Sequence, residues 1–216
     1  KQGIFYKNEN GKLPLTVNGK LKAGNYEIDG NISSQFITGL LYALPLLEGD
    51  SKLIINKNLE SKGYVDLTLE ILKLAGIEIV NNDYKSFDIK GNQTYKPFNY
   101  TVEGDYSQVA FWIVAGIISA NRDNEVKCLH VNKNSLQGDR EIIEIVTRMG
   151  ANLEIFDDYV IVKPSKTKGT VIDISQCPDI GPILTVLAAL SEGETRIING
   201  ERLRIKESDR ITSIKT

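Results

Sequence analysis

The sequence predicts an α/β chain built from a repeated β-α-β-α-β-β unit. Three observations lead to this prediction. Gly30 and Ser33 recur at one fixed offset as Gly104 and Ser107. Gly76, which follows an amphipathic stretch, recurs at the same offset as Gly150. Strand-like and helix-like segments also alternate in the same order in both copies, and a third copy begins but stops halfway.

Each copy is predicted to open with a strand that leads through a turn into a mainly apolar helix. The opening strands are expected at residues 25–28, 100–103 and 170–174. Apolar runs predict the helices at residues 35–46, 107–119 and 179–190. A second strand follows each helix, at residues 52–56, 125–131 and 195–198. Because these helices are apolar nearly all round, we expect them to lie inside, covered by sheets and other helices.

The first two copies continue with an amphipathic helix and two short strands. The apolar spacing predicts helices at residues 65–74 and 141–149, each stopped by a glycine. Asn and Asp turns then predict strand pairs at residues 78–80 with 86–90 and 152–155 with 159–162. A strand-like stretch at residues 13–17 is interpreted as the tail of a preceding unit. Acidic residues followed by Lys at 207–216 predict the start of a helix.

The composition excludes several classes of protein. The 216 residues are 41% apolar and 25% charged, as in ordinary globular proteins with a sizeable core. The net charge of −2 gives no reason to expect nucleic acid or a membrane as partner. The longest apolar run, residues 109–118, is too short to span a bilayer. Cys128 and Cys177 are too few for a disulfide scaffold and lack the spacing of a zinc site, so we expect a cytoplasmic protein without a metal.

The ends of the sequence suggest a piece of a longer protein. Met149 is the only methionine, so Lys1 is not a native translation start, and no signal-peptide pattern is present. The last predicted helix stops before it is complete. We therefore expect a fragment, and the alternative is a tag-cleaved protein with a frayed tail.

Two turns before predicted helices carry hydroxyl donors. Gly30 leads to Ser33 and Ser34, where the free N–H groups and the dipole of a helix start favour an anion. A serine N-cap is the structural alternative, and this turn taken alone favours it. Ser61 and Lys62 form a second donor cluster before the helix at 65–74, with an ordinary capping turn as its alternative.

Further candidates lie in the third copy. Asp179 follows Pro178 at a helix start and aligns with Gln35, so it is either a first-turn acid or a base in a cleft. Residues 202–210 form the densest charged stretch. The alternation with apolar residues predicts an extended segment in which Arg202, Arg204 and Lys206 share one face. Such a run is usually a solvated face, but Lys and Arg in a cleft also suit phosphate and carboxylate groups.

Five strings in this order resemble the EPSP synthase (3-phosphoshikimate 1-carboxyvinyltransferase) family. They are GNISSQF at 30–36, SKGY at 61–64, NSLQGD at 134–139, PD at 178–179 and RIKESDR at 204–210. The resemblance covers essentially the whole chain but only the middle of that enzyme. It implies the enolpyruvyl transferase fold, two lobes each built from three βαβαββ units. Residues 1–102 are then part of the N-terminal lobe and residues 103–216 part of the C-terminal lobe, both incomplete.

The resemblance also implies an activity, the transfer of the enolpyruvyl group of phosphoenolpyruvate to the 5-hydroxyl of shikimate 3-phosphate. This reaction belongs to the shikimate pathway, which leads through chorismate to aromatic amino acids. The implied partners are these two small molecules, without a metal or organic cofactor, nucleic acid or membrane, and with the enzyme as a monomer. The chain by itself is expected to be inactive, because neither part holds three units.

By position, the resemblance assigns roles to individual residues. Asp179 takes the proton of the 5-hydroxyl, and Glu207 protonates the methylene carbon. The contacts of shikimate 3-phosphate are Ser33, Ser34, Gln35, Ser61, Asp179 and Lys206. Those of phosphoenolpyruvate are Gln35 and Arg210, and Tyr64 lies beside Ser61.

Two positions depart from the family's pattern. Gly63 stands where many members have Pro, which predicts a looser turn. Arg202 stands where some members have an Asn that touches the substrate, so no role is carried over to it. The alternatives are a sister enolpyruvyl transferase that acts on UDP-N-acetylglucosamine and a non-catalytic, anion-binding core fragment. The sister enzyme is expected to lack the strings at 33–35 and 206–210 together.

Overall fold

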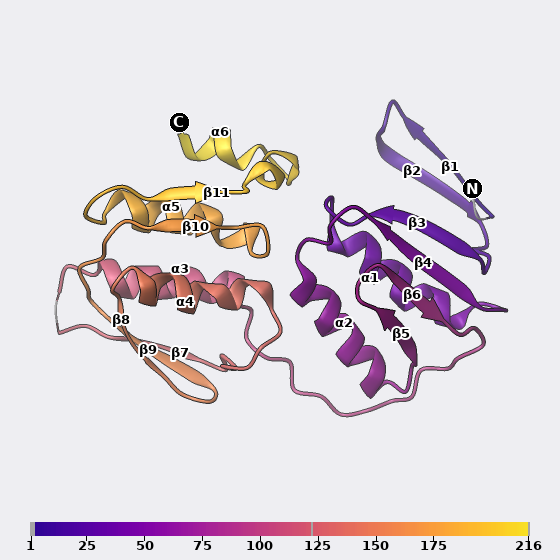
Figure 1. The fold of residues 1–216 in the computed structure, drawn as a ribbon, viewed down its shortest axis with the longest axis horizontal. Helices are drawn as coiled ribbons and strands as arrows, with labels where there is room; N and C mark the ends of the chain where they lie inside the picture. The colour runs from indigo at the N-terminus through magenta and orange to yellow at the C-terminus, as the bar shows by residue number, and fades with distance from the viewer. Residues whose placement is uncertain (1–2, 122, 216) are drawn as a thin grey trace. The chain divides into compact units, whose positions relative to one another are not determined.

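Two units, each with its own contacts, make up the computed structural model, which describes residues 3–121 and 123–215 (Figure 1). The first unit holds the residues through Leu59 together with Thr68–Asn99. The second holds Glu60–Leu67 together with the residues from Tyr100 onward. The excursion of Glu60–Leu67 into the second unit is not anticipated by the sequence, and the assignment of residues 1–102 and 103–216 to two lobes stays a prediction.

Residues 25–89 form one complete β-α-β-α-β-β motif, which belongs to the first unit except for the start of its second helix, residues 62–67. Its elements are β3 (Asn25–Asp29), α1 (Ser34–Ala43), a 3-10 turn (Leu44–Leu46), β4 (Ser51–Asn56), α2 (Lys62–Leu74), β5 (Ile79–Asn82) and β6 (Ser86–Ile89). The sheet runs in the order β3-β4-β6-β5, with β3 parallel to β4 and β6 antiparallel to both its neighbours. The predicted unit is therefore confirmed, with α2 starting at Lys62 rather than at residue 65.

A hairpin precedes this motif. It consists of β1 (Ile4–Glu9) and β2 (Lys12–Gly19), which are antiparallel. β2 contains the strand predicted at 13–17, whereas β1 is an addition to the prediction. The turn between them is Asn10-Gly11, and both residues have positive φ, 52° and 78°. An Asn-Gly pair of this kind is a strong hairpin signal, so the pairing with β1 has a local cause in the sequence.

The glycines at positions 76 and 150 end α2 and α4 as predicted. Gly76 has φ 78°, its N–H donates to the carbonyl of Lys73, and the N–H of Ile77 donates to that of Leu72. Gly150 has φ 96° and shows the same pattern of paired hydrogen bonds in the second copy. This is the Schellman arrangement, which needs a left-handed residue after the helix. The repeat is thus a repeat of backbone geometry as well as of sequence.

The second unit contains the second copy and half of the third. Its elements are α3 (Tyr106–Ile118), β7 (Val126–Leu129), a 3-10 turn (Gly138–Arg140), α4 (Glu141–Arg148), β8 (Asn152–Ile155), β9 (Tyr159–Lys163), β10 (Val171–Asp173), a 3-10 turn (Pro178–Ile180), α5 (Gly181–Ala189), β11 (Arg196–Ile198), a 3-10 helix (Glu201–Ile205) and α6 (Arg210–Lys215). β7, β9 and β8 form one antiparallel sheet, and β10 pairs in parallel with β11. The half unit β10-α5-β11 and the final helix are therefore confirmed.

The strand predicted at residues 100–103 does not form. Gly104 donates its N–H to the carbonyl oxygen of His130 at 2.7 Å. His130 is the residue just after the end of β7. The Glu103 carboxylate instead accepts hydrogen bonds from the side chains of Ser135 and Gln137. Side-chain contacts therefore take the place of the sheet pairing that the first and third copies have.

The charged stretch is not extended, so the predicted common face of Arg202, Arg204 and Lys206 is wrong. Residues Glu201–Ile205 form a 3-10 helix after Gly200, with Leu203 buried in the core. With about three residues per turn, neighbouring basic side chains point in different directions. Arg202 is buried, whereas Arg204 is exposed and pairs with Asp209 at 2.9 Å.

The apolar helices are buried on one side only, which corrects the expectation that they lie fully inside. α3 packs against β7, β9 and α5 through residues such as Ile113 and Ile117, which are nearly inaccessible. Its other face carries Phe111 and Trp112, which are 49% and 65% exposed. The cover of each helix comes from one sheet and its neighbours, so it buries only the face turned toward them.

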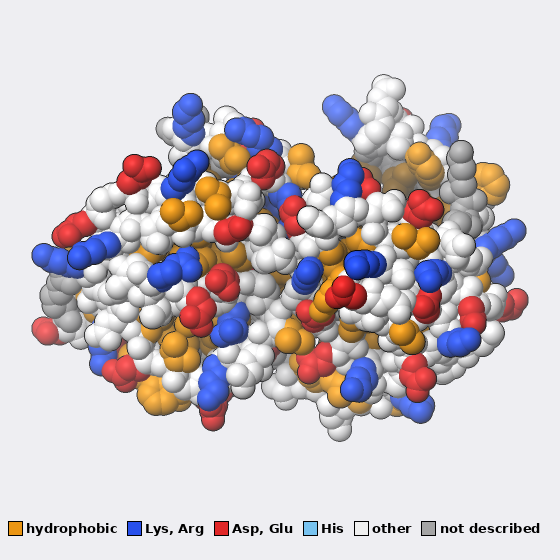
Figure 2. All heavy atoms as spheres, viewed as in Figure 1, with side chains coloured by type: hydrophobic (Ala, Val, Ile, Leu, Met, Phe, Trp, Pro, Cys, Tyr) orange, Lys and Arg blue, Asp and Glu red, His pale blue; other side chains and the backbone are white. Residues whose placement is uncertain are grey.

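On the face in Figure 2, Lys and Arg are interspersed with Asp and Glu.

Candidate active site

A cluster of four charged side chains forms where α5 and α6 begin in the second unit. Asp179 Oδ1 lies 3.0 Å from Lys206 Nζ and 2.8 Å from Arg210 Nη1. Arg210 Nη2 lies 2.7 Å from Glu207 Oε2. The 3-10 turn at Pro178 positions Asp179, and the first turn of α6 positions Arg210. The structure thus brings together four predicted site residues from two stretches of the sequence.

The electrostatics of this cluster keep Asp179 ionised. Partial burial opposes ionisation of its carboxyl, but the hydrogen bonds and charges of Lys206 and Arg210 outweigh burial and lower its pKa. Glu207 differs because its side chain is 82% exposed. Its own backbone amide and the Arg210 guanidinium lower its pKa, so it is also ionised at neutral pH in this arrangement. An acid that delivers a proton needs the opposite shift, so the predicted acid role of Glu207 stays a prediction.

The predicted residues of the first unit lie at the start of α1. Ser33 is the N-cap, with extended backbone (φ −157°), and its Oγ accepts a hydrogen bond from the N–H of Gln35 at 3.3 Å. Ser34 is buried and Gln35 is exposed. Gly30 is required in the turn, because a Cβ there would lie 2.7 Å from Ile55 and 3.0 Å from Leu59. The capping role is confirmed, and the Ser33 hydroxyl proton is left available to an anion.

The turn before α2 belongs to the second unit. Ser61 is 2% exposed and has φ 54°, and its Oγ accepts a hydrogen bond from Arg202 at 2.9 Å. The N–H of Lys62 donates to Gln176 Oε1 at 3.0 Å. A Cβ on Gly63 would lie 2.2 Å from the carbonyl oxygen of Leu136, so this turn is closely packed. The prediction of a looser turn at Gly63 is therefore wrong, because the backbone of residues 136–138 approaches too closely for any side chain.

Tyr64 pairs with a buried carboxylate that the sequence analysis does not single out. The phenol of Tyr64 donates to Asp139 Oδ2, and Asp139 is fully buried. Burial raises the pKa of Asp139 to about 6, against the opposing effect of the Tyr64 hydrogen bond. Asp179 raises this pKa further and Lys206 lowers it, so Asp139 shares an electrostatic environment with the charged cluster. The signal in the sequence is the last residue of the NSLQGD string.

The rest of that string has a structural role. Gln137 accepts the N–H of Tyr106 at 2.8 Å and donates to Glu103 and to the carbonyl of Gly104, both at 2.9 Å. Ser135 also donates to Glu103. These contacts fix the start of α3 against the turn that carries Asp139. Residues 134–137 therefore help to position the buried carboxylate of Asp139.

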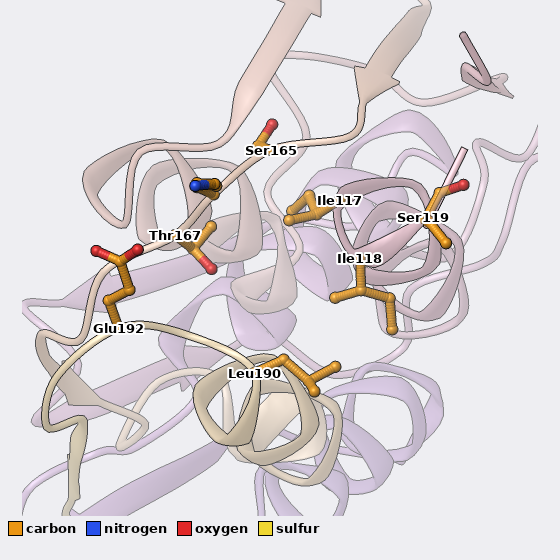
Figure 3. A pocket seen from close by; sticks show the side chains of 9 residues that line it. Ile117, Ile118, Ser119, Ser165, Thr167, Leu190 and Glu192 are labelled. Atoms are coloured by element: carbon orange, nitrogen blue, oxygen red, sulfur yellow. The ribbon is translucent and has the colours of Figure 1, made fainter. Parts of the chain in front are cut away.

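A pocket in the second unit lies apart from the predicted site residues. A pocket of about 380 Å³ lies at the ends of α3 and α5, lined by residues that include Ile117, Leu190 and Glu192 (Figure 3). None of the predicted site residues lines it. Burial raises the pKa of the Cys177 thiol to about 12, so it stays protonated and is a poor nucleophile. In the part of the chain that the structure describes, we find neither a group of three metal-ligating side chains nor a helix able to cross a membrane.

The predicted site residues thus fall into three groups. Asp179, Lys206, Glu207 and Arg210 form the charged cluster, and Ser61 and Tyr64 lie in the turn held by Arg202 and Asp139. Ser33, Ser34 and Gln35 lie in the other unit. Sequence reasoning misses Asp139 and the partners of Arg202, since contacts between segments far apart in the sequence leave no local pattern.

Comparison with known proteins places these residues in a family. The sequence model of EPSP synthase (3-phosphoshikimate 1-carboxyvinyltransferase) matches residues 2–216. A 3-phosphoshikimate 1-carboxyvinyltransferase of Clostridium novyi is 58% identical over 100% of this chain and 48% of its own length. One from Clostridium kluyveri is 54% identical over 99% of this chain and 49% of its own length. The chain therefore spans about half the length of the curated relatives it matches.

Solved structures agree at the level of the fold. An EPSP synthase from Acinetobacter baumannii superposes with a TM-score of 0.74 at 24% identity, over 99% of this chain and 49% of that one. The enolpyruvyl transferase NikO from Streptomyces tendae gives a TM-score of 0.70 at 19% identity, over 91% of this chain and 48% of that one. The fold predicted from the repeat is therefore that of the enolpyruvyl transferases.

Proposed function

The chain belongs to the EPSP synthase family, and from that premise we propose what its residues do. In a full-length member that contains them, they transfer the enolpyruvyl group of phosphoenolpyruvate to the 5-hydroxyl of shikimate 3-phosphate. The observation that carries the proposal is the cluster in which Asp179 contacts Lys206 and Arg210 within 3.0 Å. A carboxylate beside two cations suits the removal of a proton from one of two bound anionic substrates.

Asp179 is proposed as the base. Addition of the 5-hydroxyl to the enol phosphate of phosphoenolpyruvate requires removal of the hydroxyl proton and protonation of the methylene carbon. Departure of phosphate, with loss of a proton from the new methyl group, then restores the enolpyruvyl double bond. The carboxylate of Asp179 is ionised and can accept that proton. Lys206 and Arg210, which now lower its pKa, are also the proposed contacts of the anionic substrates. When they turn toward those anions, their effect on Asp179 weakens and its basicity rises.

Glu207 is proposed as the acid that protonates the methylene carbon. Its exposure and its contact with Arg210 favour the ionised form in the absence of substrate. An anionic substrate that takes over Arg210 removes one of the causes of the lowered pKa. A second anion nearby then favours protonation of the carboxyl. Two carboxylates in different environments can divide the base and acid roles in this way.

The remaining proposed contacts hold the charge of the substrates. Ser33, Ser34 and Gln35 offer hydroxyl, amide and helix N-terminal donors to shikimate 3-phosphate. Gln35 and Arg210 are proposed for phosphoenolpyruvate. The alternative acceptor, UDP-N-acetylglucosamine, is disfavoured because the strings at 33–35 and 206–210 occur together and the family match spans both.

Phosphate release from phosphoenolpyruvate plus shikimate 3-phosphate, measured on the full-length protein, tests this proposal. Asp179→Asn or Glu207→Gln should lower turnover by about a hundredfold or more with both substrates saturating. The matched control is Glu201→Gln, an exposed carboxylate of the same unit, which should keep wild-type turnover. Near-normal turnover of either variant contradicts the role assigned to that residue, and an inactive wild-type protein contradicts the function.

A further inference from the structure

The guanidinium of Arg202 is buried and crowded at one nitrogen. Its side chain is 10% exposed. Nη1 donates to Ser61 Oγ at 2.9 Å and to the carbonyl oxygen of Ser175 at 3.3 Å. The same nitrogen lies 3.3 Å from Glu60 Oε2. An arginine has five N–H donors in a fixed planar fork, and here a single nitrogen serves all three acceptors.

Another part of the same guanidinium is unsatisfied. The Nε atom of Arg202 is buried and has no hydrogen-bond partner among the described residues. A buried donor without an acceptor is unfavourable, and this one carries part of a positive charge. The side of an arginine fork that includes Nε is well suited to phosphate and carboxylate oxygens. The site therefore lacks an acceptor, and an oxyanion has the matching chemistry.

Two neighbours of Arg202 define how such a group would be received. Ser61 uses a lone pair to accept from Nη1, which leaves its hydroxyl proton for another acceptor. Glu60 is the more exposed member of the ion pair, with 28% of its side chain accessible. Its contact is also among the longest that Arg202 makes. Glu60 is thus the group that an incoming anion can displace with least disturbance.

We propose that Arg202, together with the Ser61 hydroxyl, binds a phosphate group and that Glu60 occupies the guanidinium until the phosphate arrives. The inference rests on the proposed function, which identifies shikimate 3-phosphate as the source of the phosphate. It adds a cationic ligand at a position where no role could be carried over from the family. It also assigns to Glu60 the part of a competing anion.

The two roles predict effects of opposite sign on binding. In the full-length protein, Arg202→Gln should weaken shikimate 3-phosphate binding by tenfold or more, since a charge-assisted hydrogen bond is lost. Glu60→Gln should tighten binding by about threefold, because the competing carboxylate is gone while Arg202 remains. Arg204→Gln is the matched control, because Arg204 lies in the same 3-10 helix but is exposed and paired with Asp209. Its affinity should stay within twofold of wild type.

Isothermal titration with shikimate 3-phosphate and with shikimate, which lacks the phosphate, separates the possible ligands. Affinity for shikimate should be the same in the wild-type, Arg202→Gln and Glu60→Gln proteins. Equal losses for both ligands would show that Arg202 does not read the phosphate. Unchanged or weaker binding in Glu60→Gln would overturn the proposal, and this variant decides the matter if Arg202→Gln does not fold.

Wild-type measurements distinguish this inference from the proposed function. Shikimate 3-phosphate binding without enolpyruvyl transfer contradicts only the function. Normal transfer, combined with Arg202→Gln affinity within twofold of wild type, contradicts only the inference. A wild-type protein that binds no shikimate 3-phosphate contradicts both.

Discussion

Asp179 and Asp139 lie in neighbouring turns of the second unit, yet their environments act in opposite directions. Asp179 contacts Lys206 and Arg210, and its pKa is lowered despite partial burial. Asp139 is fully buried and has only the Tyr64 phenol as a hydrogen-bonding partner among the described residues, so burial dominates and its pKa rises to about 6. The difference follows from the presence or absence of a cation in contact with the carboxylate.

The raised pKa of Asp139 makes stability depend on pH. Because the folded-state pKa exceeds the ordinary value near 3.9, this group contributes stability that is full below about pH 4 and is lost as pH rises through 6. The loss is about 3 kcal/mol, from roughly two pKa units. Asp139→Asn does not titrate and keeps an acceptor for Tyr64. Its free energy of unfolding, relative to wild type, should therefore rise by about 3 kcal/mol between pH 4 and 7.5.

Urea unfolding of both proteins across this pH range measures the difference directly. Other titrating groups that face Asp139, namely Asp179, Asp105, Lys206 and Tyr64, are present in both proteins, so their contributions largely cancel. Parallel stability curves for the wild-type and Asp139→Asn proteins would contradict the prediction.

Sequence reasoning at this scale succeeds where a residue acts through a local motif. Ser33 as an N-cap follows from its place before an apolar run. Arg202 and Asp139 escape it because their partners, Ser61 and Tyr64, lie in a distant part of the sequence. A buried Arg on a short 3-10 helix has the same local sequence as an exposed one. Here Leu203 is buried, and hydrogen bonds to Ser61 and to the carbonyl oxygen of Ser175 hold the Arg202 side chain inward.

At the scale of elements, the start of α2 shows how a glycine can fix a segment. Gly63 lies in the first turn of the helix, where Ala would usually be favoured over Gly. A Cβ at this position would lie 2.2 Å from Leu136 O and 3.0 Å from Gly138 N. The backbone at Gly63 therefore lies directly against the backbone of residues 136–138. The Glu60–Leu67 segment can remain beside residues 136–138 only without a side chain here.

Gly63→Ala is therefore expected to destabilise the chain. Overpacking of this kind costs about 1–3 kcal/mol, which exceeds the helix-propensity gain of about 1 kcal/mol. The control is Gly39→Ala in α1, where an added Cβ meets nothing within 4 Å. That variant should gain about 0.5–1 kcal/mol. Urea midpoints of the two variants should thus move in opposite directions, and a stabilised Gly63→Ala protein would show that this contact is not formed in solution.

Elements are predictable where the signal lies within a few positions of the chain. The Schellman glycines and the amphipathic helices follow from repeats and periodicity. The prediction of a strand at residues 100–103 is wrong because a strand needs a neighbouring strand in register to pair with. The nearby strand β7 already ends at Leu129. Ser135 and Gln137, from the loop that follows β7, bind Glu103 instead. The 3-10 helix at Glu201–Ile205 is missed because its basic and apolar residues alternate like those of a strand.

For the whole molecule, the proposed substrates draw on groups from both units. Ser33, Ser34 and Gln35 belong to the first, and the cluster of Asp179, Lys206, Glu207 and Arg210 belongs to the second. Both proposed substrates carry phosphate and carboxylate groups, so the proposed reaction requires both sets of donors to reach the same pair of ligands, with water excluded. Closure of an enzyme's parts on its substrates is one general way to complete such a site. The chain spans about half the length of its curated relatives.

We therefore expect the chain of 216 residues to fold and to show no measurable enolpyruvyl transfer by itself. Purified chain and a full-length relative, such as the protein of Clostridium novyi, would be compared by phosphate release from phosphoenolpyruvate plus shikimate 3-phosphate. Circular dichroism of the chain confirms that an absence of turnover reflects a folded protein. Turnover within about tenfold of a typical enzyme rate near 10 s⁻¹ would show that the two units are sufficient. In that case Ser33–Gln35 and the Asp179 cluster can be brought onto the same substrates by these residues alone, and the requirement for two complete lobes would have to be abandoned.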